Sequence, residues 1–287
     1  MRLLVLGAGG QLGRDVVRAA LAAGESVIGL THRECDVTDR AAVQAAFESE
    51  HPDAVVNCAA WTRVDAAEDH ETEAAAINAT GAGNVAEVAG AGGAALCHVS
   101  TDYVFDGTSS TPIAEDAPPQ PISAYGRTKL AGEEAVRAAM GERALIVRTA
   151  WVYGAYGPNF VLTMLRLARD RGSLRVVADQ TGTPTWTGHL APALLRLLHR
   201  HEIGTLHLTN SGETTWHGFA QAIVEDSGLS DVPVEAITTA EYPTPARRPA
   251  YSVLDNGRWR DLGEAPLPNW RDGLRTYLRE LTPQKTR

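Results

Sequence analysis

The sequence is poor in cysteine and in aromatic residues, and it has no long apolar run. Its three cysteines, Cys35, Cys58 and Cys97, are an odd number without metal-ligand spacing, so we expect reduced thiols rather than a disulfide framework. No stretch approaches the length of a membrane span, and the opening MRLLVLG is too short for a signal-peptide core. We therefore expect a cytoplasmic protein with no membrane partner.

Positive charge is also scarce. The 287 residues include 26 Lys and Arg against 35 Asp and Glu, and the formal net charge of −9 argues against a nucleic-acid partner. The run HRH at 199–201 has no matching ligand set, so we predict no metal site there. With 44% hydrophobic and 21% charged residues, the chain has the composition of a globular protein of one large or two modest domains.

Strands and helices alternate through the first half of the chain. Apolar runs predict strands near 2–6, 26–30, 53–57, 94–99 and 143–148, and helical patterns predict helices near 11–23, 40–50, 72–91 and 124–140. Strands that are apolar on both faces, such as AVVNCAA, are typical of a parallel sheet covered by helices on each side. We predict an α/β fold with a doubly wound parallel sheet of Rossmann type.

The pattern becomes mixed after Trp151. It predicts helices near 159–171, 188–200 and 216–227, short strands at 174–177 and 205–210, and a proline-rich stretch at 243–249. We predict a dinucleotide-binding domain over residues 1–150. The smaller mixed α/β part over 151–287 would mainly bind substrate, with some of its elements returning to the first domain.

A glycine turn, GAGGQLG, joins the first predicted strand to the first helix. Such a turn allows close approach of the backbone to a pyrophosphate, and the N–H groups of the first helical turn then face the phosphates. The spacing G-x-x-G-x-x-G differs from the common G-x-G-x-x-G, and a glycine turn without a ligand is the alternative. The cofactor contacts predicted here are Gly7, Gly10, Gln11, Leu12 and Gly13.

Tyr125 and Lys129 lie four residues apart in a predicted helix, so both side chains leave the same helix face. A nearby ammonium favours phenolate over phenol, which lowers the pKa of the phenol and makes it a usable proton donor or acceptor. Taken alone, an exposed helix face explains the spacing equally well. The glycine turn upstream favours the catalytic interpretation.

These motifs resemble those of the extended short-chain dehydrogenases/reductases, most closely the dTDP-4-dehydrorhamnose reductases of nucleotide-sugar metabolism. The matching runs extend from residue 5 to about 256 and include GAGGQLGRDV, PDAVVNCAAWTRVDAAE, HVSTDYVFDG, SAYGRTKLAGE and YPTPARRPAYSVLDN. The resemblance implies an oxidoreductase that reduces the C4 ketone of a dTDP-4-keto-6-deoxyhexose. The implied reaction converts dTDP-4-dehydro-L-rhamnose to dTDP-L-rhamnose.

The resemblance also implies three catalytic residues. Tyr125 would deliver the proton to the developing alkoxide, Lys129 would lower the phenol's pKa and hold the nicotinamide ribose, and Thr101 would orient the carbonyl. The implied substrate contacts are Thr101, Asp102, Tyr125, Trp151 and Arg248. Turn chemistry is the alternative for Thr101, a core tryptophan for Trp151 and a surface arginine for Arg248.

NADPH is the expected cofactor, with NADH as the alternative. The second predicted strand ends in GLTHRECDV, where Arg33 offers positive charge to a 2′-phosphate and no acidic residue takes the ribose 2′-hydroxyl. A solvated Arg33 is the alternative. The resemblance adds cofactor contacts at Tyr125 and Lys129, and at Asp36, Val37, Ala59, Ala60, Trp61 and Val99. The Asp36–Val37 pair could equally be a helix cap with a buried neighbour.

Three other functions stay open: a reductase for a related dTDP-deoxysugar of natural-product glycosylation, an epimerase or dehydratase with tightly held NAD, and a non-catalytic dinucleotide-binding regulatory subunit. Some similar reductases are magnesium-bridged dimers that use carboxylates near the first helix and after a DQ-x-G-x-P-T run. Asp15 could supply the first carboxylate, but residues 185–195 contain no Asp or Glu. We expect a monomer or homodimer without a metal.

Overall fold

The computed structural model describes residues 1–281, and its centre is a six-stranded parallel sheet. The strand order is β10-β5-β4-β3-β1-β2, and all neighbouring strands pair in parallel. The predicted doubly wound α/β fold is confirmed. The strands are β1 (Arg2–Leu6), β2 (Ser26–Leu30), β3 (Ala54–Asn57), β4 (Ala95–Thr101), β5 (Leu145–Thr149) and β10 (Gly204–His207).

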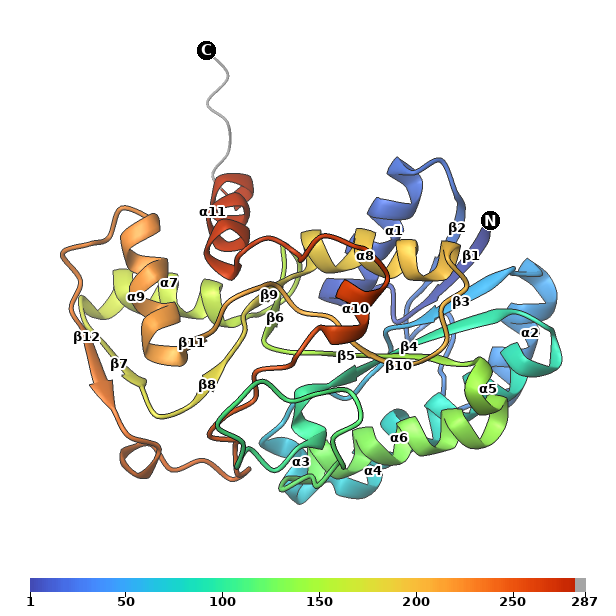
Figure 1. Cartoon of the computed structure of the whole chain (residues 1–287), viewed down its shortest axis with the longest axis horizontal. Helices are drawn as coiled ribbons and strands as arrows, with labels where there is room; N and C mark the ends of the chain where they lie inside the picture. Colours follow the sequence, from blue (N-terminus) through green and yellow to red (C-terminus); the bar gives the residue numbers. More distant parts are fainter. Residues whose placement is uncertain (282–287) are drawn as a thin grey trace, which may run out of the picture.

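Helices cover both faces of this sheet (Figure 1). One face packs against α1 (Gln11–Ala22) and α8 (Thr187–His199), which contact each other. The other packs against α2 (Arg40–Glu50), α5 (Ala82–Ala91) and α6 (Ala124–Met140). Because both faces are buried, the central strands carry apolar side chains on each side, as their sequence predicted.

A second group of elements lies beside the sheet, at the left of Figure 1. Its three helices share a separate apolar core. They are α7 (Phe160–Arg171), α9 (Trp216–Asp226) and α11 (Trp270–Leu281). Its strands form three two-stranded pairs, β7 (Leu174–Val177) with β12 (Val234–Ile237), β8 (Thr181–Gly182) with β11 (Thr214–Thr215), and β6 (Val152–Tyr153) with β9 (Thr185–Trp186).

The long helix predicted over 72–91 is not continuous. It is divided into α4 (Glu71–Ala75), the π-helical segment η1 (Ala76–Gly81) and α5. Gly132 of α6 lies directly against the Asn78 carbonyl of η1, so the widened turn is found where the two helices approach most closely. The other short elements are α3 (Ala66–Asp69), α10 (Gly257–Asp261) and 3₁₀ turns at Asp102–Val104, Gly141–Arg143 and Thr239–Glu241.

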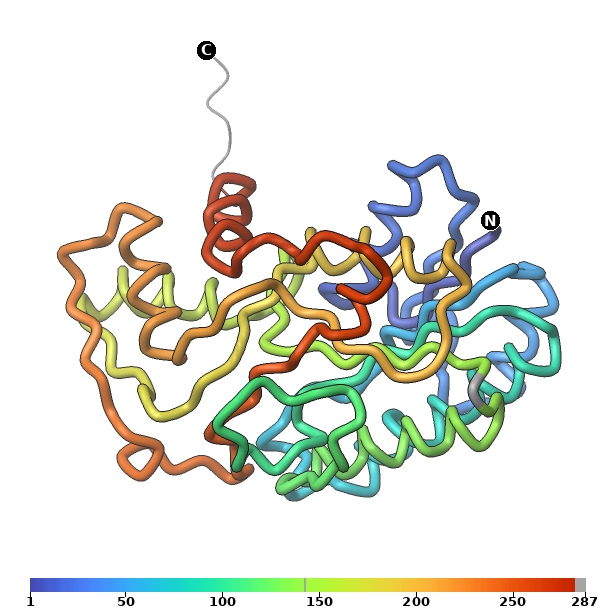
Figure 2. Tube along the Cα trace, viewed as in Figure 1, coloured from blue at the N-terminus to red at the C-terminus, as the bar shows by residue number. Residues whose placement is uncertain are grey.

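The chain crosses more than once between the sheet and the second group. After β9 it returns as α8 and β10, and β10 pairs with β5 at the edge of the main sheet. Later, residues 249–255, which we call the strap, pass the loop before α6, as Figure 2 shows. Ile113 of that loop bridges Leu254 of the strap, and Thr181 bridges Tyr251. The two groups are therefore interlocked rather than joined by one linker.

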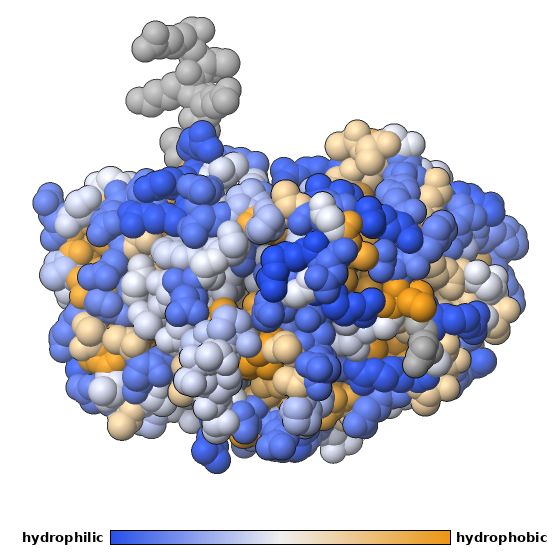
Figure 3. Space-filling view, in the orientation of Figure 1, coloured by the Kyte–Doolittle hydropathy of each residue, from blue (hydrophilic) through white to orange (hydrophobic). Residues whose placement is uncertain are grey.

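The surface seen in Figure 3 is mainly polar, with apolar residues in small separate patches. Within residues 1–281, no helix is both long enough and apolar enough to cross a membrane.

Candidate functional site

The glycine turn packs too closely for larger residues. Gly7 has φ +75°, and a Cβ at this position would lie 2.6 Å from the amide nitrogen of Ala59. A Cβ on Gly13 would clash with the Gly7 carbonyl oxygen. Helix α1 begins at Gln11 after Gly10, which offers no side-chain cap. The first N–H groups of α1 thus lie beside a compact turn, an arrangement that suits a pyrophosphate.

The predicted contacts after β2 form a turn. Arg33 is exposed, and it forms no ion pair within residues 1–281. Asp36 accepts hydrogen bonds from the amide and hydroxyl of Thr38 at 2.9 and 2.8 Å, which holds the pKa of its carboxyl below the usual range. Val37 is buried against Gly81. The cap of α2 is Asp39, so Asp36 closes a turn and does not cap a helix.

The run from Ala59 to Trp61 lies beside the glycine turn. Asn57 holds its beginning, because the Asn57 side chain accepts a hydrogen bond from Ala59 N at 3.1 Å. Asn78 holds its end with two bonds, accepting from Trp61 N at 2.8 Å and donating to Trp61 O at 3.2 Å. The backbone through Ala60 is therefore fixed at the carboxyl end of β3, next to the turn that would receive the cofactor.

Tyr125, Thr101 and Asp102 form a buried polar cluster. Thr101 is the last residue of β4, two residues beyond the predicted strand end, and its hydroxyl donates to Asp102 at 2.9 Å. The Thr101 hydroxyl lies close enough to Tyr125 to lower the pKa of the phenol. Ser252 of the strap lowers the pKa of Asp102 in the same way, and Asp102 Oδ2 has no hydrogen-bond partner among the described residues. Ser123 caps α6 by accepting from Gly126 N at 3.2 Å, which sets where the helix bearing Tyr125 begins.

Lys129 lies one turn after Tyr125 on α6, and it is 2% exposed. Its ammonium donates to the Val99 carbonyl on β4 at 2.8 Å. The predicted helix and shared face are confirmed, and the alternative of an exposed helix face is wrong because both side chains are buried. This bond brings Val99, a predicted cofactor contact, next to Lys129.

Burial dominates the protonation of these groups. It raises the pKa of Tyr125 to about 12, although the bond to Thr101 opposes the shift. It lowers the pKa of Lys129 to about 8. It raises the pKa of Asp102 to about 6. The pKa of the phenol is raised rather than lowered in this structure, because burial disfavours the phenolate and only the Thr101 hydroxyl opposes the shift.

Trp151 is partly buried and packs against the edges of two apolar clusters. Its backbone is left-handed, with φ +47°, and its ring stacks on Trp216 of α9 at 3.6 Å between centroids. Gly182 lies directly against this ring. A strained backbone that presents a half-buried ring suits a ligand surface better than a core position.

Arg248 is not a free cation. Its guanidinium makes a two-point contact with the Asp65 carboxylate, at 3.0 and 2.8 Å, and it also donates to the hydroxyl of Thr244. The fork that a diphosphate would use is therefore engaged by Asp65 in this structure.

Asp15 is 1% exposed on α1. Its carboxylate accepts a hydrogen bond from Thr187 at the start of α8, and the Arg18 guanidinium lies 3.1 Å away. Arg18 also approaches Glu280 of α11 at 3.8 Å. One hydrogen-bond donor and one cation thus lie against this carboxylate.

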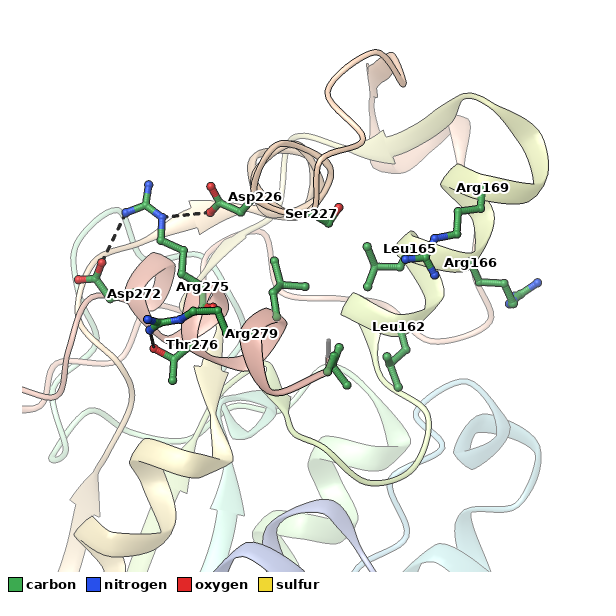
Figure 4. Close-up of a pocket in the computed structure, with 12 residues that line it drawn as sticks. Leu162, Leu165, Arg166, Arg169, Asp226, Ser227, Asp272, Arg275, Thr276 and Arg279 are labelled. Carbon is green, nitrogen blue, oxygen red and sulfur yellow. Dashed lines mark hydrogen bonds and ion pairs between the residues drawn. The ribbon is translucent and has the colours of Figure 1, made fainter. Parts of the chain in front are cut away.

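A wide hollow of about 1070 Å³ lies elsewhere, between α7, α9 and α11 (Figure 4). Its walls carry Arg166, Arg169, Arg275 and Arg279 over a leucine floor, and Arg275 pairs with Asp226 and Asp272. The predicted site residues do not line this hollow.

A model of one protein family, described as the RmlD substrate binding domain, matches residues 1–282. The chain belongs to this family. A probable dTDP-4,6-dihydroxy-2-methyloxan-3-one 4-ketoreductase of Streptomyces antibioticus is 47% identical, over 96% of this chain and 94% of the relative. A dTDP-4-dehydrorhamnose reductase of Streptomyces griseus is 44% identical, over 95% of this chain and 91% of the relative.

A solved structure also resembles this RmlD-family chain over nearly its whole length. The dTDP-4-dehydrorhamnose reductase of Bacillus anthracis, crystallised in complex with NADP, superposes with a TM-score of 0.94 at 37% identity. The match covers 97% of this chain and 99% of that one. The family resemblance read from the motifs is confirmed.

The sequence analysis missed several residues that shape the site. Trp216 stacks on Trp151, and Ser252 reaches Asp102 from a distant part of the chain. Asn78 is a buried amide in an alanine-rich helix, and this polar residue in an apolar pattern was a usable signal. The sequence held no signal for Ser252, because its approach to Asp102 depends on the path of the strap.

Proposed function

We propose that this protein reduces the C4 ketone of a dTDP-4-keto-6-deoxyhexose with NADPH, converting dTDP-4-dehydro-L-rhamnose to dTDP-L-rhamnose. The observation that carries the proposal is that Tyr125 and Lys129 of α6 are buried at the end of β4, close to Thr101, and that a compact glycine turn precedes α1. Relatives with 42 to 45% identity over most of the chain are named dTDP-4-dehydrorhamnose reductases.

Each side chain has one task in the proposed mechanism. The N–H groups at the start of α1 would hold the phosphates of NADPH and Lys129 would hold its ribose, and the bound cofactor would supply the hydride. Thr101 and Tyr125 bind the ketone oxygen, and Tyr125 donates its proton there as negative charge develops. Lys129 stabilises the phenolate that remains. Trp151 and Trp216 offer an aromatic wall for the deoxysugar, and Asp102 would accept from a sugar hydroxyl.

A second reaction of the same type is supported by one observation. The Streptomyces antibioticus relative, at 47% identity, is named a 4-ketoreductase of a different dTDP-sugar. We therefore propose a related dTDP-deoxysugar as the alternative substrate. The nucleotide, the C4 ketone and the residue roles would stay the same.

The product separates these possibilities. The purified protein is incubated with NADPH and dTDP-4-keto-6-deoxyglucose, with and without a 3,5-epimerase, and the product sugar is identified by NMR. Reduction that requires the epimerase and yields the rhamnose configuration supports the first proposal. Reduction without the epimerase supports the alternative, whereas epimerisation or dehydration without consumption of NADPH contradicts both.

The mechanism predicts that Tyr125→Phe loses turnover and keeps cofactor binding. The phenyl ring fills the same space but cannot donate a proton, so kcat should fall at least about a hundredfold. Binding of NADPH is measured by fluorescence titration, and kcat by loss of NADPH absorbance. Near-normal turnover in this variant would remove Tyr125 from the mechanism.

We propose further that the protein works in the cytoplasm as a monomer or homodimer, with a dinucleotide-binding part over residues 1–150. The contacts of Asp15 with Thr187 and Arg18 support assembly without a metal bridge. Light scattering with and without EDTA tests this, and a loss of mass with EDTA would contradict it.

A further inference from the structure

A buried carboxylate lies behind the catalytic residues. Glu133 on α6 is 0% exposed. Arg148 of β5 binds it through two parallel hydrogen bonds of 2.9 and 2.8 Å. Arg137 donates at 2.8 Å, and the Ser100 hydroxyl donates at 2.6 Å. These three partners, through four hydrogen bonds, satisfy the charge of a group that would otherwise destabilise the fold.

The position of Glu133 links it to the proposed chemistry. It lies one helical turn after Lys129, on the same face of α6. Its partner Ser100 lies on β4 between Val99, whose carbonyl binds the Lys129 ammonium, and Thr101. One carboxylate therefore ties the helix that carries Lys129 to the strand that carries Thr101.

Several charged or titratable groups share this region. The Lys129 ammonium is influenced by Glu133 and Cys58, and the imidazole of His98 on β4 lies close to both Lys129 and Glu133. Arg148 and Arg137 add positive charge, and His207 of β10 lies 3.5 Å from Arg148. Burial holds the pKa of His98 well below its usual value and that of His207 at about 3, so both rings are neutral at working pH.

Glu133 therefore supplies the negative charge that opposes the loss of the Lys129 proton. Burial lowers the pKa of Lys129, and of the groups that raise it Glu133 has the larger effect. The two arginines keep Glu133 itself ionised, with its pKa at about 2.

We propose that Glu133 is a positioning residue, which ties the helix carrying Lys129 to β4 and keeps the Lys129 ammonium charged, and that Arg148 holds the Glu133 carboxylate in place. The inference rests on the proposed function, because it assigns this role through Lys129. It adds a residue that does not itself touch substrate or cofactor.

The pH dependence of kcat tests the proposal. Glu133→Gln keeps the shape but removes the negative charge, so the basic limb of the profile should move to lower pH by about one unit. Arg148→Gln removes an opposing positive charge, so the limb should move to higher pH. A purely structural role would lower stability in both variants without shifts of opposite sign.

If the Glu133 and Arg148 variants do not fold, substitutions of two exposed arginines provide a second test and its control. Arg137 is 40% exposed, and Arg137→Gln should move the basic limb upward by a fraction of a unit. Arg127 lies on the same helix, paired with Glu71 on the outside, and Arg127→Gln should leave the limb unchanged.

The outcomes separate the two proposals. A wild-type protein that binds NADPH but reduces no 4-keto dTDP-sugar contradicts the proposed function. The inference is overturned if the wild-type protein reduces the sugar but the folded Glu133 and Arg148 variants do not shift the basic limb of the pH profile in opposite directions. If neither buried variant folds, an unmoved limb in Arg137→Gln overturns it.

Discussion

At the scale of single residues, the site holds a carboxyl group whose ionised form is disfavoured by burial. Asp102 is 2% exposed, and burial raises the pKa of its carboxyl to about 6 although the Thr101 hydroxyl donates to it. The folded state therefore holds the proton more tightly than the unfolded chain, where this pKa has its usual value of 3.8. The resulting stability is complete below pH 3.8 and is lost as the pH rises through about 6.

Asp102→Asn should reduce the dependence of stability on pH. Between pH 4.5 and pH 8, the free energy of unfolding should fall by about 2 kcal/mol less in the variant than in the wild type, because the amide has no proton to lose. Urea denaturation at the two pH values measures this. Asp116→Asn, at an exposed position on the following loop, is the control and should match the wild type.

At the scale of elements, the catalytic helix depends on one close helix contact. Helix α6 reaches the π-helical segment η1 because Gly132 has no side chain, and a Cβ there would overlap the Asn78 carbonyl. Asn78 in turn holds Trp61 and donates to Thr128 of α6 at 3.0 Å. Packing between two helices thus also orders the strand-end run at the cofactor site.

Gly132→Ala should destabilise the protein by about 1–3 kcal/mol, since the methyl group must push α6 away from η1. Gly83→Ala in α5 is the matched control, because its new Cβ would meet only the Ala135 methyl group at 3.3 Å. Guanidinium denaturation measures both variants. Equal changes in the two would show that α6 tolerates the displacement.

An element could be predicted from the sequence when its own residues determine where it begins and ends, and could not when a distant contact does. The central strands and α6 were predictable because their burial patterns and caps lie within each element. The break at η1 was not, because it depends on Gly132, some fifty residues later. Helix α11 was missed although Trp270, Leu274 and Tyr277 recur at helical spacing along it, and its buried side chains share the apolar core of α7 and α9.

The same distinction applies to the site. Tyr125, Lys129 and the glycine turn were predictable because spacing within one element defines them. The exposure of Arg33 agrees with the solvated alternative in this structure, and Arg248 proved to be paired with Asp65. Ion-pair partners far apart in the sequence leave no local pattern.

At the scale of the whole molecule, residues after 151 complete the core of the first part. Leu3, Val5 and Val16 share one apolar cluster with Leu194 of α8 and Leu206 of β10. A chain that ends at residue 150 would leave this face of the sheet exposed to water.

A fragment of residues 1–150 should therefore lack a cooperative thermal transition, whereas residues 1–281 should unfold in one. Circular dichroism during heating measures both, and binding of the dye ANS reports exposed apolar surface. Cooperative melting of the short fragment without ANS binding would identify it as an independent folding unit.

The repeated crossing of the chain has a consequence for protein engineering. Sugar preference in this fold cannot be exchanged by replacing one contiguous segment, because a single junction would separate β10 from its sheet and the strap from its loop. A chimera between two such enzymes needs several compatible junctions. Natural divergence toward new sugars should accordingly proceed by scattered point substitutions rather than by recombination of whole lobes.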